Sequence, residues 1–444
     1  MQLRALLGVV ALAATAQAST ASLKAAIKNV VILVMENRSL DNLLGGQTIA
    51  GLENPINNGP FCNPWSLTDS SQGQACTAAN SYDSVVNDPD HAVYGNNMQF
   101  YGNFIPNNTA IAAGTLLPTQ KGFLQEQLRL YPSVSKATLA KQVMGYYTEA
   151  QVPVLTSLVK NFVTFNNWHS DVPGPTDPNR IALVSGSSYG HGSNDAAFTA
   201  RGFNQKSIFQ SVTEAGKNWR NYHDPAGGTG PEAQWFNWTY NNNLQSRVVN
   251  LSQFYVDAAA GNLTALSFLN PSCCGVGTTS MHPSGLISAG EALIKKVYES
   301  LRASPQWNST LFILTFDETG GFHDHVPPPV VPRPDTLTFT TTPPGGGSYT
   351  FPFNRLGGRL PTLLISPWVD KAFVEKKGTN SAGQTGVSYS ATSILRTLGL
   401  LWDFAPYNPR VSAAPAFDHL IRTTTRTAPA TLPAVTPFRA MYRA

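Results

Sequence analysis

Charged residues are scarce in this chain of 444 residues. Asp, Glu, Lys and Arg make up 13% of the sequence, where about a quarter is typical of soluble domains. The formal net charge is only +4, and no run of Lys or Arg stands out. A weak and dispersed positive charge lacks the electrostatic footprint of a nucleic-acid-binding protein. We therefore expect no nucleic acid among the partners.

Long apolar runs are also missing beyond the first residues. No later stretch reaches eighteen consecutive apolar residues, so we expect no transmembrane segment. Residues 1–18, MQLRALLGVVALAATAQA, combine a basic start, an apolar stretch and a small-x-small end, which is typical of a signal peptide. This predicts a protein that is secreted or held in the cell wall, with at most transient contact with a membrane surface. The oligomeric state is left open.

Cysteine is nearly absent, with four residues in all: Cys62, Cys76, Cys273 and Cys274. Four cysteines allow three disulfide connectivities. A bond between Cys62 and Cys76 would close a short polar loop, while Cys273 and Cys274 would pair with each other or cross to the first two. The spacing leaves these alternatives open. It does not favour a thiolate metal site in an oxidising compartment.

Glycine and proline are plentiful, at 36 and 32 residues, which indicates long loops. We expect one catalytic domain over residues 19–404, rich in insertions at 47–120 and 187–271, followed by a Pro/Ala/Thr-rich extension at 405–444. Six N-x-S/T sequons predict a glycoprotein. They lie at Asn37, Asn107, Asn237, Asn250, Asn262 and Asn308.

Two buried-strand patterns each end in polar side chains. The apolar run 311–316 is followed by Asp317 and Glu318, and the run 30–35 is followed by Glu36 and Asn37. An amphipathic segment at about 287–301 leads into the first run, which favours an α/β fold with a mostly parallel central sheet and helices on both faces. Ligands of such sheets bind beyond the carboxyl ends of the strands.

Adjacent carboxylates repel each other unless a cation lies between them, so these strand ends predict a site for a divalent metal ion. Ca²⁺, Mg²⁺, Mn²⁺ and Zn²⁺ all accept such oxygen ligands. The alternative is that Asp317 and Glu318 form a solvated acidic turn and that Glu36 is a turn residue beside a short helix capped by Ser39 and Asp41.

The segment WHSDVPGPTDPNR, residues 168–180, predicts a proline-rich loop that enters a helix, with Asp177 as its cap and Pro178 at the first position. Thr176 would lie at the amino end of that helix, where free N–H groups and the helix dipole favour phosphate. This makes Thr176 the candidate nucleophile, the alternative being a capping hydroxyl. A lone histidine such as His91 is more often a structural residue than a catalytic one.

Three segments resemble the phosphoesterase family of secreted phospholipases C and related acid phosphatases, and the chain is similar to its fungal-type members. They are VMENRSLDNLLGG, MGYYTEAQVPVLTSLVKNFVTFNNWHSDVPGPTDPNR and LTFDETGGFHDHVPPP, in the family's order. The resemblance spans about residues 29–400 and implies an alkaline-phosphatase-like α/β fold. Departures are Met35, where the family usually has Gln, and Ala391, where many members have His.

The resemblance also implies roles for individual residues. The implied metal ligands are Glu36, Asn37, Thr176, Asp317 and Glu318. Thr176 would be the nucleophile, and the histidines around the phosphoryl group would be His91, His223 and His282. Asn37 would then be excluded from glycosylation, because it would lie inside the site.

Together these features predict a secreted, metal-dependent phospholipase C that acts through a phospho-threonine intermediate, releasing diacylglycerol and a phosphorylated headgroup. Its lipid headgroup would be accepted by the aromatic segment 219–255 and the insertion 47–120. The first alternative is an acid phosphatase that cleaves small phosphomonoesters. The second, from another class, is a catalytically silent binding or cell-wall protein.

Overall fold

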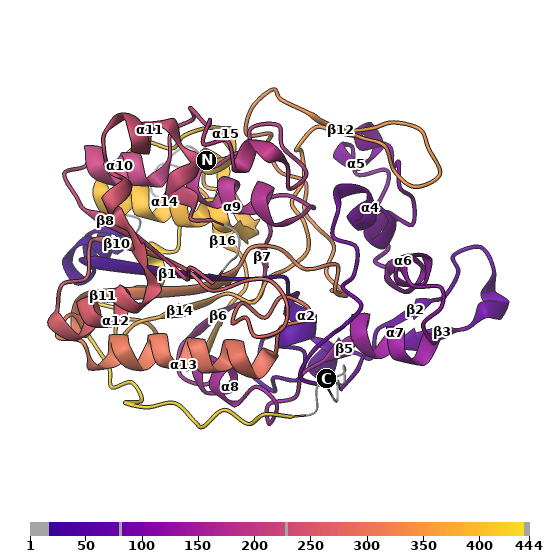
Figure 1. The fold of residues 1–444 in the computed structure, drawn as a ribbon, viewed down its shortest axis with the longest axis horizontal. Coiled ribbons are helices and arrows are strands. Elements are labelled where there is room, and N and C mark those ends of the chain that lie inside the picture. Colours follow the sequence, from indigo (N-terminus) through magenta and orange to yellow (C-terminus); the bar gives the residue numbers. More distant parts are fainter. Residues whose placement is uncertain (1–16, 80–81, 227–229, 439–444) are drawn as a thin grey trace, which may run out of the picture.

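The two apolar runs lie side by side as the central strands of a sheet (Figure 1). This computed structural model describes residues 17–79, 82–226 and 230–438. In that part of the chain the main sheet has eight strands. In spatial order they are β15 (Phe373–Glu375), β6 (Val163–Phe165), β14 (Leu363–Ile365), β11 (Thr310–Phe316), β1 (Asn29–Met35), β10 (Leu266–Asn270), β8 (Trp219–His223) and β9 (Val248–Asn250).

All pairings in this sheet are parallel except those of β14, which runs antiparallel to both of its neighbours. β1 and β11 are buried along their whole length, because helices cover both faces of the sheet there. That environment explains why both strands are continuously apolar instead of alternating. The predicted α/β fold with a mostly parallel sheet is confirmed.

Helices cover both faces of the sheet, and the helices on each face pack against one another (Figure 1). One face carries α8 (Pro153–Val159), α12 (Leu251–Ala260) and α13 (Ile287–Ala303). The other carries α9 (Thr176–Ser185), α10 (Ile208–Glu214) and α14 (Ala391–Trp402). α13 begins and ends close to the bounds that its amphipathic pattern predicts.

Residues 47–143 form a lobe at one end of the sheet, on the right of Figure 1. Its elements include β2 (Cys62–Pro64), β3 (Gln74–Cys76), α4 (Val93–Tyr101), α5 (Asn108–Ala112), α6 (Phe123–Leu130) and α7 (Lys136–Val143). They bury a hydrophobic cluster of their own around Phe100, Phe123 and Leu139. The lobe therefore has its own core, although the sequence shows little periodicity there.

The remaining elements are short. They are α2 (Leu40–Leu43), α3 (Pro55–Asn58), α11 (Asn237–Asn241), α15 (Pro409–Ala413) and the strand pairs β4 (Ala78–Ala79) with β5 (Gly145–Tyr146), β7 (Trp168–His169) with β18 (Tyr389–Ser390), β12 (Phe339–Thr341) with β13 (Tyr349–Phe351), and β16 (Gly378–Thr379) with β17 (Thr385–Val387). None of the helices within the described residues is long and apolar enough to cross a membrane.

Most of the aromatic side chains in the segment 219–255 do not face a substrate, contrary to expectation, and only Trp238, Tyr240 and Tyr255 are partly exposed. Trp219, Tyr222, Trp235, Phe236 and Phe254 are all buried in the main core. The segment supplies β8 and β9, and β10 follows it, so its rings pack beneath and between these strands. The sequence conceals this, because β8 reads Trp-Arg-Asn-Tyr-His and has no continuous apolar run.

The structure resolves the disulfide alternatives. Cys62 pairs with Cys76 across the β2–β3 hairpin, and Cys273 pairs with its sequence neighbour Cys274. The predicted signal peptide lies outside the described residues except for its last two positions. Residues 405–438 pack back on the domain. Among them, Asp418 accepts hydrogen bonds from the hydroxyls of Ser19 and Thr20.

Candidate active site

The predicted acidic residues meet because β1 and β11 are parallel neighbours in matched register. Met35 pairs with Phe316, so Glu36 and Asp317 leave the same edge of the sheet side by side. Both side chains are buried. The backbone N–H groups of Asn37 and Glu318 donate to Oδ1 of Asp317, at 3.2 and 2.8 Å. Glu36, Asn37, Asp317 and Glu318 therefore converge, as the strand-end pattern predicts.

A buried arginine ties these strand ends together. Arg180 donates from Nε to Asp317 Oδ2 at 2.9 Å, from NH2 to Glu36 Oε1 at 2.8 Å and from NH1 to Glu232 Oε1 at 2.9 Å. Burial alone would lower the pKa of the guanidinium, but the three carboxylates outweigh burial and raise this pKa above its ordinary value. Arg180 is thus a permanent cation among three acids. No pattern in the sequence around Arg180 predicts this role.

Thr176 is the first residue of α9 and is almost fully buried, with 3% of its surface exposed. Arg180 follows four residues later, on the same helix face. Thr176 therefore lies at the helix end nearest the carboxylates, where the helix dipole favours an anion. The predicted cap is wrong in detail. The cap residue is Pro175, and Asp177 lies inside the first turn.

Asn37 has a left-handed backbone, with a φ of 64° that Asn tolerates better than most residues. Gly320, also left-handed at φ 64°, packs against it so closely that a Cβ there would lie 2.0 Å from Asn37 Oδ1. Because Gly320 has no side chain, the loop after β11 can contact the loop after β1 at Asn37. Backbone strain of this kind gathers at functional sites.

Several buried polar atoms at this point lack a hydrogen-bond partner among the described residues. They are Oδ1 and Nδ2 of Asn37, Oε1 of Glu318 and Oε2 of Glu232. Oxygens left without a donor beside a cluster of carboxylates are the ligands that a hard divalent cation takes. The residues present therefore fit the metal ion that the sequence predicts.

Burial is the largest cause of the pKa shifts of Asp317 and Glu318, the two acids that follow β11. It raises the pKa of Asp317 to about 6, with Glu36 adding to the rise and Arg180 opposing it. It raises the pKa of Glu318 to about 8, with His91 opposing the rise and Asp317 adding to it. Both acids thus hold protons more tightly than free carboxyls do, as long as no additional cation stabilises their charge.

Two of the three predicted histidines lie together. The rings of His91 and His282 are 6.1 Å apart and meet edge to face. Oδ2 of Asp88 lies 4.0 Å from Nδ1 of His91 and 3.9 Å from Nε2 of His282. Asp88 lies in the loop before α4, three residues before His91 in the sequence.

The two imidazoles differ in charge. Burial alone would lower the pKa of His91, but the carboxylates of Glu318 and Asp88 raise it to about 9. Burial lowers the pKa of His282 in spite of Asp88. The pKa of His91 therefore lies above the ordinary value of a histidine and that of His282 lies below it, which suits an acid and a base.

His223, the third predicted histidine, is the last residue of β8 and pairs with Asn270 of β10. It lies at the same edge of the sheet, and Asn270 in turn donates to Glu232 at 2.9 Å. Among the described residues, no hydrogen bond or ion pair joins His223 directly to Glu36 or Asp317. Glu232, which binds Arg180, carries no sequence signal that would have revealed it.

The HDH end of the third segment has a structural role. Arg359 bridges Asp41 and Asp324 at 2.9 and 2.8 Å, and Asp41 also accepts from the backbone and ring of His325. The ring of His325 stacks on Phe61 at 3.9 Å. These contacts fasten the loop after β11 to α2, so the strand ends carrying Glu36 and Asp317 keep their positions.

Comparisons with known proteins agree on one family. The model of the Phosphoesterase family matches residues 27–405. Non-specific phospholipase C6 of Arabidopsis thaliana is 35% identical over 430 residues, covering 93% of this chain and 76% of the plant protein. Phospholipase C A of Mycobacterium tuberculosis is 24% identical over 387 residues, covering 77% of this chain and 68% of the bacterial one.

Similar solved structures overlap only loosely. The lipoteichoic acid synthase LtaP of Listeria monocytogenes has a TM-score of 0.37 and 9% identity, covering 90% of this chain and 77% of its own. A protein in the alkaline phosphatase superfamily from Vibrio parahaemolyticus has a TM-score of 0.35 and 11% identity, covering 60% and 64%.

Replacing Arg180 should strongly destabilise the fold. Arg180→Met leaves three buried carboxylates without their cation, which costs about 3–5 kcal/mol of unfolding free energy. The control is Arg422→Met, which removes a largely exposed pair with Asp370 and should cost at most about 1 kcal/mol. Urea unfolding measures both. Equal losses would show that Arg180 does not hold the site together.

Gly320→Ala should disturb the site through Asn37. The matched control is Gly261→Ala, because Gly261 is also left-handed, at φ 70° and ψ 30°, and the nearest atom to a Cβ there is a side-chain carbon of Pro305 at 3.4 Å, an ordinary contact distance. Both variants pay about 1–2 kcal/mol for a left-handed alanine. Only Gly320→Ala should also lower catalytic turnover, by displacing Asn37. The same turnover in the two variants would contradict the role given to this contact.

Proposed function

Because the chain belongs to the Phosphoesterase family, and so is a hydrolase that acts on phosphate esters, we propose that it is a secreted, metal-dependent phospholipase C. It cleaves a phospholipid on the glycerol side of the phosphate and releases diacylglycerol and a phosphorylated headgroup. The similarity to proteins named phospholipase C from a plant and a bacterium supports this substrate class. The residues 1–18 support secretion.

One observation carries the chemistry. The buried hydroxyl of Thr176, at the amino end of α9, lies one helical turn before Arg180, which binds Glu36 and Asp317 in a cluster that has buried oxygens without a hydrogen-bond donor among the described residues. We assign the cation to Glu36, Asn37, Thr176, Asp317 and Glu318. When bound, it neutralises phosphate charge and makes a neighbouring hydroxyl more acidic.

The protein groups then divide the reaction. The Thr176 hydroxyl attacks phosphorus as its proton passes to neutral His282, and the dipole at the amino end of α9 stabilises the phosphate oxygens. The bond from phosphorus to the glycerol oxygen breaks, protonated His91 gives its proton to that oxygen, and a phospho-threonine that carries the headgroup remains. The water that later hydrolyses the phospho-threonine gives its proton to His91, which is then neutral, and His282 returns its proton to the Thr176 oxygen. Arg180 keeps Glu36 and Asp317 in place and touches no substrate.

Removing the nucleophile should abolish turnover. Thr176→Ala is expected to lower diacylglycerol release from phosphatidylcholine vesicles by at least ~10³-fold. The control Thr340→Ala alters an exposed hydroxyl in β12 and should leave the rate unchanged. Near-normal turnover by Thr176→Ala would contradict a phospho-threonine. Phosphate release from para-nitrophenyl phosphate with no diacylglycerol from vesicles would instead assign the protein as an acid phosphatase.

Cation binding should stabilise the protein more at higher pH. The pKa values of Asp317 and Glu318, about 6 and about 8, lie above the ordinary values of about 4. The folded state therefore holds these protons more tightly than the unfolded state. Without a cation, stability falls as the pH rises from about 4 to about 8. A cation needs deprotonated ligands, so its contribution grows over the same window.

The measurement is the unfolding temperature of chelator-treated protein with and without added Ca²⁺, Mg²⁺, Mn²⁺ or Zn²⁺, at about pH 5 and about pH 8. At least one ion should raise it, and by more at the higher pH. Glu318→Gln should reduce that difference. No stabilisation by any of these ions would contradict the metal site independently of activity.

A further inference from the structure

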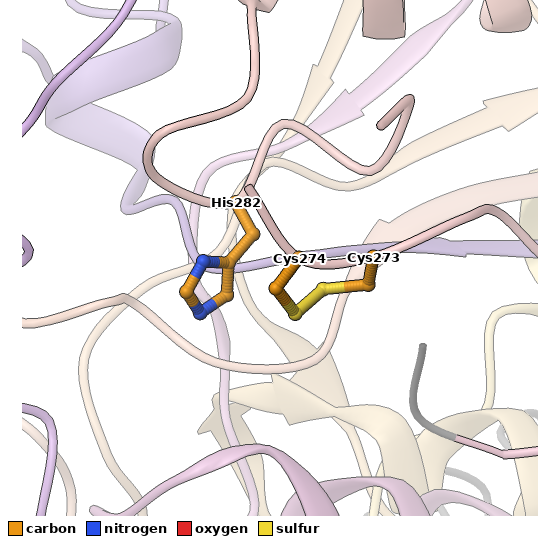
Figure 2. Close-up of side chains that lie close together, drawn as sticks. All are labelled: Cys273, Cys274 and His282. Atoms are coloured by element: carbon orange, nitrogen blue, oxygen red, sulfur yellow. A yellow bond between two sulfur atoms is a disulfide. The ribbon is translucent and has the colours of Figure 1, made fainter. Parts of the chain in front are cut away.

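The disulfide between Cys273 and Cys274 lies against the acid cluster. Both residues follow β10 at the carboxyl edge of the sheet, and Sγ of Cys273 is 2.8 Å from Oε2 of Glu36, with Sγ of Cys274 at 3.6 Å. Figure 2 shows the ring of His282 beside Cys274. Ligand atoms of these two cysteines and of His282 all lie within 4.8 Å of one another.

Two cysteines and a histidine are a ligand set of zinc sites. With Zn–S near 2.3 Å and Zn–N near 2.0 Å, two ligands of one tetrahedral ion lie up to roughly 4 Å apart. The three side chains thus need only small shifts to reach a common ion. In the disulfide form the sulfurs are neutral and bonded to each other, so they are poor ligands. Reduction would release two thiols in the same place.

The two sulfurs differ in access. Cys274 is exposed, whereas Cys273 is buried, with 6% of its surface accessible. An external thiol can therefore attack Sγ of Cys274, and Cys273 is the leaving sulfur, next to Glu36. The Cys62–Cys76 disulfide differs, because no cluster of three metal-ligand side chains includes it among the residues that the structure describes.

We propose that Cys273, Cys274 and His282 form a second metal site, which opens on reduction and takes a thiolate-preferring divalent cation such as Zn²⁺. A dithiol reductant supplies two electrons and two protons. The S–S bond breaks, the reductant leaves as its cyclic disulfide, and the two cysteines become thiols. The cation then displaces both thiol protons. This site is distinct from the oxygen-ligand site of Asp317 and Glu318, which suits harder cations.

A cation bound by Cys273, Cys274 and His282 would inhibit the hydrolysis of the phosphate ester. It would take the lone pair of His282 and place positive charge against Glu36. This consequence rests on the proposed function, whereas the cation site itself does not. The reduced protein would thus be inhibited by Zn²⁺, and the oxidised protein would not be inhibited through these cysteines.

The test uses the full chain, reduced with dithiothreitol and desalted without oxygen, with Cd²⁺ as the probe. Thiolate-to-Cd²⁺ charge transfer in the ultraviolet reports binding without any assay of activity. The reduced protein should bind a single Cd²⁺ per chain with this absorption, and the oxidised protein should show none. The double variant Cys62→Ser/Cys76→Ser should keep the signal, and Cys273→Ser/Cys274→Ser should lose it.

A signal that survives in Cys273→Ser/Cys274→Ser, or no signal in reduced wild type, would overturn the proposal. Should the Cys273→Ser/Cys274→Ser variant fail to fold, the Cys62→Ser/Cys76→Ser protein decides alone. Its only disulfide is Cys273–Cys274, so it must bind Cd²⁺ when reduced and not when oxidised. Hydrolysis is measured in parallel. An oxidised protein that cleaves no phosphate ester would contradict the proposed function, while the Cd²⁺ absorption would still decide the cation site.

Discussion

The ion cluster of Arg180 with Glu36, Asp317 and Glu232 is the contact on which the site depends. Its acids come from the end of β1, the end of β11 and a segment beyond α10, so a single guanidinium joins three distant parts of the chain. Burial makes the cluster costly unless every charge is matched, and Arg180 matches only part of the negative charge. The negative charge that remains would attract the cation that we propose for this site.

The same cluster positions Thr176, the proposed nucleophile. Because Arg180 and Thr176 share one face of α9, fixing the arginine on the strand ends also fixes the amino end of the helix beside them. Thr176 and the acids are therefore brought together by one helix that docks on one sheet. His91 and His282 reach the site from two separate loops, and Asp88 lies between them.

The disulfide at Cys273–Cys274 adds a chemical element that hydrolysis of an ester does not require. Sγ of Cys273 lies 2.8 Å from Oε2 of Glu36, so the oxidation state of the two cysteines decides whether a disulfide or two thiols lie beside that carboxylate. A soft-ligand site and a hard-ligand site at one sheet edge would couple the enzyme to both the redox state and the metal content of its surroundings. Within the described residues, the Cys62–Cys76 bond of the lobe at 47–143 has no such group of metal-ligand side chains around it.

The sequence by itself determined the α/β class, the two central strands, the helix at Thr176 and the acids at the strand ends, because these depend on local patterns. An apolar run that stops at a carboxylate is visible in a few residues. Only the tertiary structure decided the partnership of Arg180 with Glu232, the place of Asp88 between two histidines, the choice among disulfides and the burial of the aromatic segment 219–255. The contacts of Arg180, His282 and the aromatic rings join residues far apart in the chain, and the spacing of four cysteines fits more than one pairing, so no local pattern records these outcomes. The pKa of His91 was decided in the same way, since Glu318, which is distant in the sequence, raises it.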